Sequence, residues 1–130
     1  MRKLVLLTLV LMIYAPLSHV ASLKAAGGSI ETTVQSYFDY LKSGETEGIL
    51  SCLTDPLLSE RRSLLEKNTA YPEFLRDMYK SAYIVIKNVE EDKGEIEAEI
   101  YLNDEDPPLK SRFILKHESG SWLISEEINE

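Results

Sequence analysis

The sequence is poor in cysteine, histidine and positive charge. It has one cysteine in 130 residues, which excludes a disulfide within the chain. It has two histidines, and no His/Cys cluster suggests a zinc site. Its 14 lysines and arginines stand against 22 aspartates and glutamates, for a formal net charge of −8. A chain this acidic cannot hold a phosphate backbone by charge, so we expect no binding of nucleic acid.

Motifs that bind cofactors are also missing from the sequence. It contains no glycine-rich phosphate loop and no Gly-x-Ser-x-Gly turn around a nucleophile. The Asn-Asp-Glu-Asp run at residues 103–106 offers oxygen ligands, but it lacks the spacing of a calcium loop, and two prolines follow it at once. We therefore interpret this run as a solvated acidic loop, and we expect neither a metal nor a cofactor.

The first 22 residues have the layout of a secretory signal peptide. A short positive start, Met-Arg-Lys, precedes an almost wholly apolar run at residues 4–17, and small residues lead to a cleavage site after Ser22. The apolar run has 14 residues, whereas a membrane span needs roughly 20. The alternative to a cleaved signal peptide is an uncleaved N-terminal membrane anchor. With no cysteine behind the run to carry a lipid, we predict a periplasmic or secreted protein without a stable membrane anchor after cleavage.

Residues 23–28 form a flexible joint, and a helical pattern begins behind it. Ser29 can cap a helix whose apolar residues recur at positions 30, 34, 37, 38 and 41, until Gly44 ends it. Three shorter helical segments follow, starting at Thr46 and Asp55, which act as caps, and at Pro72. Near Ala82 the apolar period changes from that of a helix to that of a strand.

The second half of the chain predicts four antiparallel strands. Residues 95–102 alternate without error between apolar and polar, and a third strand is expected at about 109–118. A three-residue hairpin at residues 92–94 and a tight turn at 119–120 connect neighbouring strands. In the preferred register the defining cross-strand pairs are Ile86 with Ile100, Lys87 with Glu99, Leu102 with Leu109, Ala98 with Phe113, and Trp122 with His117.

This register places Arg112 between Glu99 and Glu127, so we interpret that arginine as part of an ion-pair ladder rather than an anion site. Cys52 is interpreted as a small buried hydrophobic residue. The fold class is α+β: N-terminal helices packed on a curved four-stranded antiparallel sheet, in one domain over residues 29–130.

Three segments carry a resemblance to a known family. They are Ile-x3-Val-x2-Tyr-Phe-x2-Leu-Lys-Ser-Gly at residues 30–44, Leu-x-Asp-Pro at 53–56, and Glu-x-Gly-x-Trp-x-Ile at 118–124. Together they resemble the nuclear transport factor 2-like (cystatin-like fold) superfamily, in particular its small secreted bacterial members. The resemblance implies a sheet curved into a cone around a pocket that the first helix caps. The superfamily includes isomerases, dehydratases and polyketide cyclases, and also many binding or accessory domains. No Asp/His pair matches its catalytic members.

The expected pocket has five candidate residues: Tyr37, Phe38, Phe113, His117 and Trp122. His117 is a weak candidate for a general acid or base, since histidine titrates near neutral pH. The alternative is a strand-end histidine packed on Trp122. On the outer sheet face, Val85, Tyr101 and Ile114 are interface candidates, because the open sheet face commonly pairs with a second copy in this superfamily. An ordinary half-hydrated face is the alternative.

Three hypotheses of function follow. The favoured one is a non-catalytic binding or accessory domain of the periplasm or the secreted fraction. The second is a small isomerase-like or dehydratase-like enzyme acting on a small apolar ligand, with His117 and a tyrosine as its acid–base pair. The third is a companion subunit for another envelope protein. A deep cavity in which His117 and a tyrosine hydroxyl converge would favour the enzyme, whereas a cavity filled by Phe38, Phe113 and Trp122 would favour a structural module.

Overall fold

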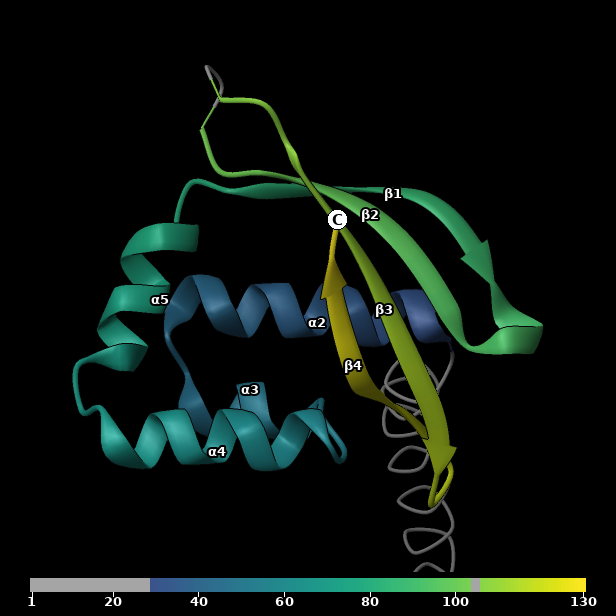
Figure 1. The fold of residues 1–130 in the computed structure, drawn as a ribbon, viewed down its shortest axis with the longest axis horizontal. Helices are drawn as coiled ribbons and strands as arrows, with labels where there is room; N and C mark the ends of the chain where they lie inside the picture. Colours follow the sequence, from purple (N-terminus) through teal and green to yellow (C-terminus); the bar gives the residue numbers. More distant parts are fainter. Residues whose placement is uncertain (1–28, 104–105) are drawn as a thin grey trace, which may run out of the picture.

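The computed structural model describes residues 29–103 and 106–130 (Figure 1). The predicted signal peptide, the joint at residues 23–28, and the middle of the acidic loop, Asp104 and Glu105, lie outside the described residues. The helices are α2 (Ile30–Ser43), α3 (Thr46–Ser51), α4 (Leu57–Lys67) and α5 (Tyr71–Tyr79), and the strands are β1 (Tyr83–Glu90), β2 (Glu95–Tyr101), β3 (Leu109–Glu118) and β4 (Ser121–Asn129). The predicted order of helices before strands is confirmed.

The ends of the helices follow from short polar residues and glycine. The Ser29 hydroxyl accepts a hydrogen bond from the Thr32 amide at 3.1 Å, and Gly44 ends α2 with a φ of 70°. The Asp55 carboxylate accepts hydrogen bonds from both the amide and the hydroxyl of Ser59 in the first turn of α4. The predicted cap at Thr46 is wrong by one residue, since Thr46 is already helical and Glu45 precedes it.

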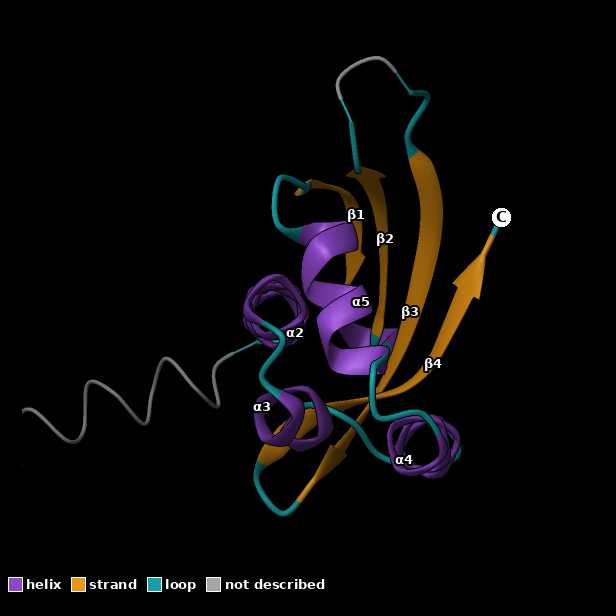
Figure 2. Cartoon of the chain, turned by 90° about the vertical axis from the view of Figure 1, so that its left-hand side faces the viewer, coloured by secondary structure: helices purple, strands orange, loops and turns teal. Residues whose placement is uncertain are grey.

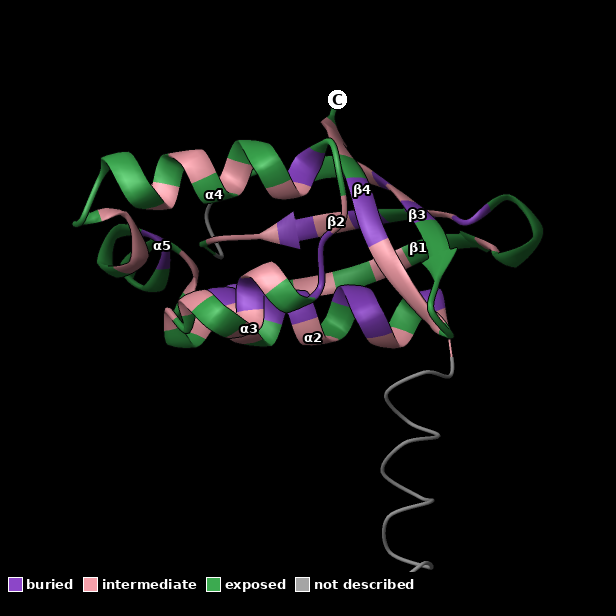
Figure 3. Ribbon diagram, turned by 90° about the horizontal axis from the view of Figure 1, so that it is seen from below, coloured by how far each residue is buried: buried purple, intermediate pink, exposed green. Residues whose placement is uncertain are grey.

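The strands form one antiparallel sheet in the order β1-β2-β3-β4, and the helices lie on one side of it (Figure 2). The predicted α+β architecture is therefore correct. The inner sheet face buries alternate residues of the middle strands: Ile96, Ala98, Ile100, Phe113 and Leu115. In contrast, α4 buries one residue fully, Leu57 at its start (Figure 3).

The predicted register is wrong by two residues in the second hairpin, and in the first by two before the bulge at Lys87 and by one beyond it. Ile100 pairs with Ile84 and with Leu109, instead of Ile86 on one side and a Leu102–Leu109 pair on the other. The first loop is longer than predicted, because a short 3₁₀ turn at Glu91–Lys93 precedes the left-handed Gly94. Leu102 lies beyond the end of β2, so the second loop is also wider than predicted.

Outside the last residues of β1, which follow a bulge, the shift changes the partners of the charged and aromatic residues without moving them to the other face. Lys87 sits at a bulge between Ile86 and Asn88, but its amine still reaches Glu99, at 3.6 Å. Phe113 lies opposite Ile96 rather than Ala98. A shift of two residues preserves the side of the sheet on which each side chain falls.

The last hairpin follows the prediction at its closed end and departs from it further along. His117 pairs with Trp122 and Leu115 with Ile124, as predicted. A bulge then inserts Ser125, whose hydroxyl donates to the Ile114 carbonyl at 3.0 Å. Beyond it Glu127 lies opposite Phe113, so the predicted pairing of Glu127 with Arg112 is wrong. The bulge turns Glu127 to the helix side of the sheet.

The tight approach of β3 to Gly94 allows a test of the fold. A Cβ at Gly94, where φ is 67°, would lie 2.6 Å from the Leu115 carbonyl oxygen. Gly120 has a φ of 82° with nothing within 4 Å of such an atom. Both alanine variants bear a left-handed backbone cost of about 1–2 kcal/mol, and we expect Gly94→Ala to lose about 2 kcal/mol more through the clash. Denaturant unfolding of both variants measures the difference, and equal losses would contradict it.

Candidate functional site

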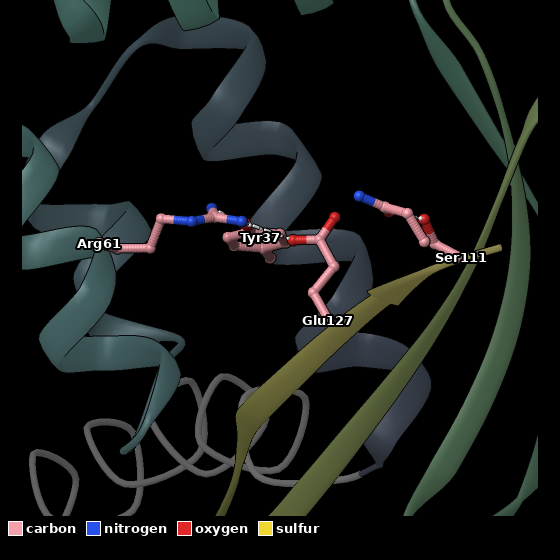
Figure 4. A network of polar contacts seen from close by, with 5 residues as sticks. Tyr37, Arg61, Ser111 and Glu127 are labelled. Atoms are coloured by element: carbon pink, nitrogen blue, oxygen red, sulfur yellow. Dashed lines mark hydrogen bonds and ion pairs between the residues drawn. The ribbon is translucent and has the colours of Figure 1, made fainter.

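A polar network joins α2, α4 and β4 on the helix side of the sheet (Figure 4). The Arg61 guanidinium contacts the Glu127 carboxylate, with 2.7 Å between Nη2 and Oε1. The Tyr37 hydroxyl donates to the same Glu127 oxygen at 3.2 Å and accepts a hydrogen bond from Arg61 Nη1. Each member therefore bonds the other two. We call Tyr37, Arg61 and Glu127 the polar triad.

The position of each side chain in the polar triad follows from the local structure of its helix or strand. Tyr37 lies on the apolar face of α2, which is fully buried at this position. Arg61 follows Leu57 by four residues, so both project from the same face of α4. Glu127 reaches the triad because of the bulge at Ser125. The adjacent end of β4 is held by Ser111, whose hydroxyl donates to the Asn129 side-chain oxygen at 2.7 Å.

The polar triad is shielded from solvent and electrically balanced. The side chains of Arg61 and Glu127 are 18% and 10% exposed. The Arg61 guanidinium carbon also lies 5.8 Å from the centroid of the Tyr37 ring, within the range of a cation–π contact. One positive and one negative charge, each hydrogen-bonded, offset much of the cost of leaving water.

Burial and neighbouring charges determine the protonation states of Tyr37 and Arg61. Burial, together with the nearby Glu127 charge, raises the pKa of Tyr37 well above its usual range. Burial alone would lower the pKa of Arg61, but Tyr37 and Glu127 outweigh it, so that the pKa of Arg61 is raised. Near neutral pH the tyrosine is thus neutral and the arginine is charged. The polar triad therefore holds α2, α4 and β4 together, and its arrangement is not that of a proton-transfer pair.

Tyr79 of α5 gives a test at alkaline pH. Burial and the Glu127 charge raise the pKa of Tyr79 to about 12. An unfolded tyrosine ionises near 10, so the unfolded chain loses its proton first and stability falls as the pH rises from about 10 to about 12. We expect Tyr79→Phe to make this fall shallower, and not to abolish it, because Tyr37 acts in the same direction.

The measurement for this prediction is the denaturant midpoint between pH 9 and pH 12. Tyr83→Phe is the matched control, since the Tyr83 side chain lies on the outer face of the sheet and is half exposed. A slope that Tyr79→Phe leaves unchanged would contradict the prediction.

Three of the five predicted pocket residues are brought together, and they fill the interior themselves. Tyr37, Phe38 and Phe113 are 0%, 4% and 0% exposed. Their ring centroids are 5.7 Å apart for Tyr37 and Phe38, 6.3 Å for Tyr37 and Phe113, and 6.1 Å for Phe38 and Phe113, all edge to face. Tyr79 extends the cluster, 5.9 Å from Phe38. These rings pack against one another where an open cavity was expected.

The other two predicted pocket residues lie at the closed end of the β3–β4 hairpin. The rings of His117 and Trp122 meet edge to face, with 5.0 Å between their centroids. His117 is exposed and Trp122 is half-buried. Tyr37 is the tyrosine among the predicted pocket residues, and its hydroxyl is hydrogen-bonded to Arg61 and Glu127 rather than to His117. The geometry is that of a strand-end histidine packed on an indole.

A hollow on the surface lies between α2, α3 and the start of β4. Its volume is about 230 Å³, and hydroxyl and aromatic side chains line it, among them Thr33, Ser36, Tyr40, Ser51 and Trp122. A second, more open hollow shares Tyr40 and Ser51 and adds the carboxylates Glu45 and Glu47. A Cβ at Gly48 would lie 2.2 Å from the Tyr40 ring, so glycine allows this ring to lie against α3. We call the two hollows together the α2–α3 groove.

The outer sheet face, where an interface was predicted, mixes apolar and charged groups. Val85 is 36% exposed, and Tyr101 and Ile114 are half-buried. Tyr101 stacks on Tyr83 with 4.7 Å between ring centroids. Its hydroxyl donates to Glu99 at 3.0 Å, and this hydrogen bond raises the pKa of Tyr101. Dimerisation through this face stays a prediction.

Arg112 and Cys52 are the remaining residues for which we made a prediction from the sequence. Arg112 lies between Glu97 and Ile128 in the sheet, so the predicted ladder with Glu99 and Glu127 is wrong. Its Nε atom is buried without a hydrogen-bond partner. Cys52 is 7% exposed as predicted, and burial raises the pKa of its thiol.

The described part of the chain offers neither a cluster of metal ligands nor a membrane-spanning helix. Within residues 29–103 and 106–130, no group of three or more histidine, cysteine, aspartate or glutamate side chains is placed to hold a metal ion. Among the same residues, no helix is both long enough and apolar enough to span a membrane.

Sequence reasoning missed Arg61 and Glu127 as partners. A signal for Arg61 was present, because a charged residue four positions after Leu57 falls on the apolar stripe of its helix. A charge on such a stripe needs a buried partner. No comparable signal marked Glu127, whose side of the sheet depends on the bulge at Ser125.

These features define an α+β protein with a filled interior, a buried polar triad and a hydroxyl-lined surface groove. No protein-family model matches the chain, and no curated protein matches it. Among solved structures it is similar to a protein of unknown function with a cystatin-like fold from Methylobium petroleophilum PM1. The identity is 13%, the match covers 78% of this chain and 74% of that chain, and the TM-score is 0.46.

Proposed function

We propose that this protein is a non-catalytic binding or accessory domain of the periplasm or the secreted fraction, of the nuclear transport factor 2-like type. The observation that carries the proposal is the filled interior. Phe38, Phe113 and Tyr37 occupy the space that a substrate would need, and the polar triad uses its own hydrogen-bonding groups internally. Acid–base catalysis needs a polar group within reach of a bound substrate.

The α2–α3 groove is the binding surface in this proposal. Tyr40 and Trp122 offer apolar rings with a polar edge, a combination that is enriched in binding surfaces. Ser36 adds a hydroxyl beside them, whereas the hydroxyls of Thr33 and Ser51 donate to the carbonyls of Trp122 and Gly48 and offer a partner their acceptor oxygens. Glu45 and Glu47 at the open end, together with the formal net charge of −8, favour a partner that carries positive charge. An envelope protein with a basic segment fits this description.

Native mass spectrometry of the protein purified from the envelope of its own host tests the proposal. We expect the exported chain to begin at Leu23 and to carry a bound partner. Ser51→Trp, which fills the groove, should lose that partner, whereas Glu66→Trp on the exposed side of α4 should keep it. A partner retained by both variants would contradict the groove. An unbound protein, or a bound molecule that is chemically converted on incubation, would contradict the function.

A further inference from the structure

The two edges of the sheet differ in whether another segment of the chain is hydrogen-bonded to them. At the β4 edge, residues 52–54 run alongside as a short parallel bridge. The Ile124 amide donates to the Cys52 carbonyl, and the Thr54 amide donates to the Ile124 carbonyl, each at 2.8 Å. At the other edge β1 pairs with β2, and in the described part of the chain no further strand or bridge lies beside it. One edge is bridged at Ile124 by another segment of the chain, and the other is open.

The open edge is also apolar. Tyr83 and Val85, on the outer face of β1, are 50% and 36% exposed, and Ile84 and Ile86 on its inner face are half-buried. A shallow groove of about 180 Å³ runs between β1 and α2 and includes Ile84 in its lining. Exposed strand edges with apolar side chains pair readily with another strand.

We propose that β1 pairs antiparallel with β1 of a second copy of this chain, on a two-fold axis at Val85. The regular part of β1 extends from Tyr83, its first residue, to Lys87, where the bulge breaks the register. Val85 is the centre of that segment. The two four-stranded sheets would then join into one of eight strands. This dimer is distinct from one built on the outer sheet face, and it does not depend on the proposed function.

The segment from Tyr83 to Lys87 is complementary to itself in this register. Ile84 lies opposite the partner's Ile86 on the inner face, and Ile86 opposite the partner's Ile84. Tyr83 lies opposite the partner's Lys87, a pairing of a ring with a cation. No like charges face each other. An axis at Lys87 would instead set that lysine against the partner's Lys87, which destabilises a strand pair.

The association would stop at two copies because each copy has one open β1 edge. A pairing about a two-fold axis uses both open edges and leaves the two β4 strands outermost. Each β4 is already hydrogen-bonded by residues 52–54 of its own chain. The joined sheet thus has no open β1 edge left for a third copy, and each of its outer edges is bridged at Ile124.

Light scattering and sedimentation of the full mature chain, across a range of concentrations, test the proposal. We expect a dimer for the unaltered protein and monomers for Val85→Lys and for Val85→Glu, each of which sets like charges opposite each other. Mixing these two variants should restore a heterodimer, because residue 85 then meets its opposite charge. Val89→Lys, equally exposed on β1 but outside the pairing segment, should stay dimeric.

Ile114→Lys separates the two possible dimers. It alters the outer sheet face and leaves the β1 edge untouched, so we expect it to remain a dimer. A strictly monomeric unaltered protein would overturn the proposal. So would a dimer that survives both Val85 variants, or one that Ile114→Lys abolishes while the mixed Val85 variants fail to recover it. Denaturant unfolding of each variant verifies that the comparison is between folded chains.

Discussion

Replacing Arg61 by methionine is expected to lower the free energy of unfolding by about 3 kcal/mol. Methionine keeps the apolar length of the side chain and removes the charge, so packing against Tyr37 is largely retained. Glu127, with a side chain 10% exposed, then keeps a buried carboxylate with one hydrogen bond from Tyr37 in place of an ion pair. Breaking one half of a buried pair costs more than the pair contributes, because the remaining charge is left in a poorly solvated place.

The Arg61 prediction is tested by a double-mutant cycle measured by denaturant unfolding. Glu127→Leu alone should be destabilising, and the double variant Arg61→Met/Glu127→Leu should recover most of the loss, because no unpaired charge remains. Arg62→Met is the control: its side chain is exposed, and we expect a change within about 0.5 kcal/mol. Additive losses in the double variant would show that the two charges do not depend on each other.

Phe113→Ala is expected to cost about 4 kcal/mol of stability, within the range measured for large aromatic residues in protein interiors. Phe113 is fully buried, and its ring contacts those of Tyr37 and Phe38 edge to face. Removing it leaves a void bounded by a helix and a sheet, neither of which can close over the gap without losing other contacts. Thermal and denaturant unfolding at neutral pH measure the loss.

A second phenylalanine provides the comparison for Phe113→Ala. Phe74 on α5 is 58% exposed, and its ring stacks on that of Tyr71 at the surface. We expect Phe74→Ala to change stability by less than about 1 kcal/mol. If Phe113→Ala were equally mild, the interior would be loosely packed, and the case against a substrate cavity would fail with it.

The elements of this fold could be predicted because local chemistry specifies them. Ser29 caps α2 and Gly44 ends it in the left-handed conformation that glycine adopts freely. The alternation in β2 and the tight turn at residues 119–120 depend only on neighbouring residues. Strand boundaries and the buried face followed from these patterns without knowledge of any distant contact.

The pairing of the strands could not be predicted in the same way. Side chains alternate with a period of two, so a register displaced by two residues keeps every apolar residue on the inner face. Agreement of the two faces therefore could not distinguish Ile84 from Ile86 as the partner of Ile100. The single-residue bulge at Ser125 does change the face, and the Arg61–Glu127 pair depends on it. The position of Arg61 on the apolar stripe of α4 indicates that it needs a buried partner, but nothing in the neighbouring sequence marks Glu127 as that partner.

The attachment of the helices to β4 bears on the order in which the chain folds. The Thr33 hydroxyl on α2 bonds the Trp122 carbonyl across 89 positions of sequence, and Arg61 on α4 bonds Glu127 across 66. These helices precede β4, the strand to which they are bonded, in the sequence and are therefore synthesised before it. Contacts of such wide separation form late and slow the acquisition of structure. The helices therefore cannot reach their final tertiary arrangement before β4 is present to bond them.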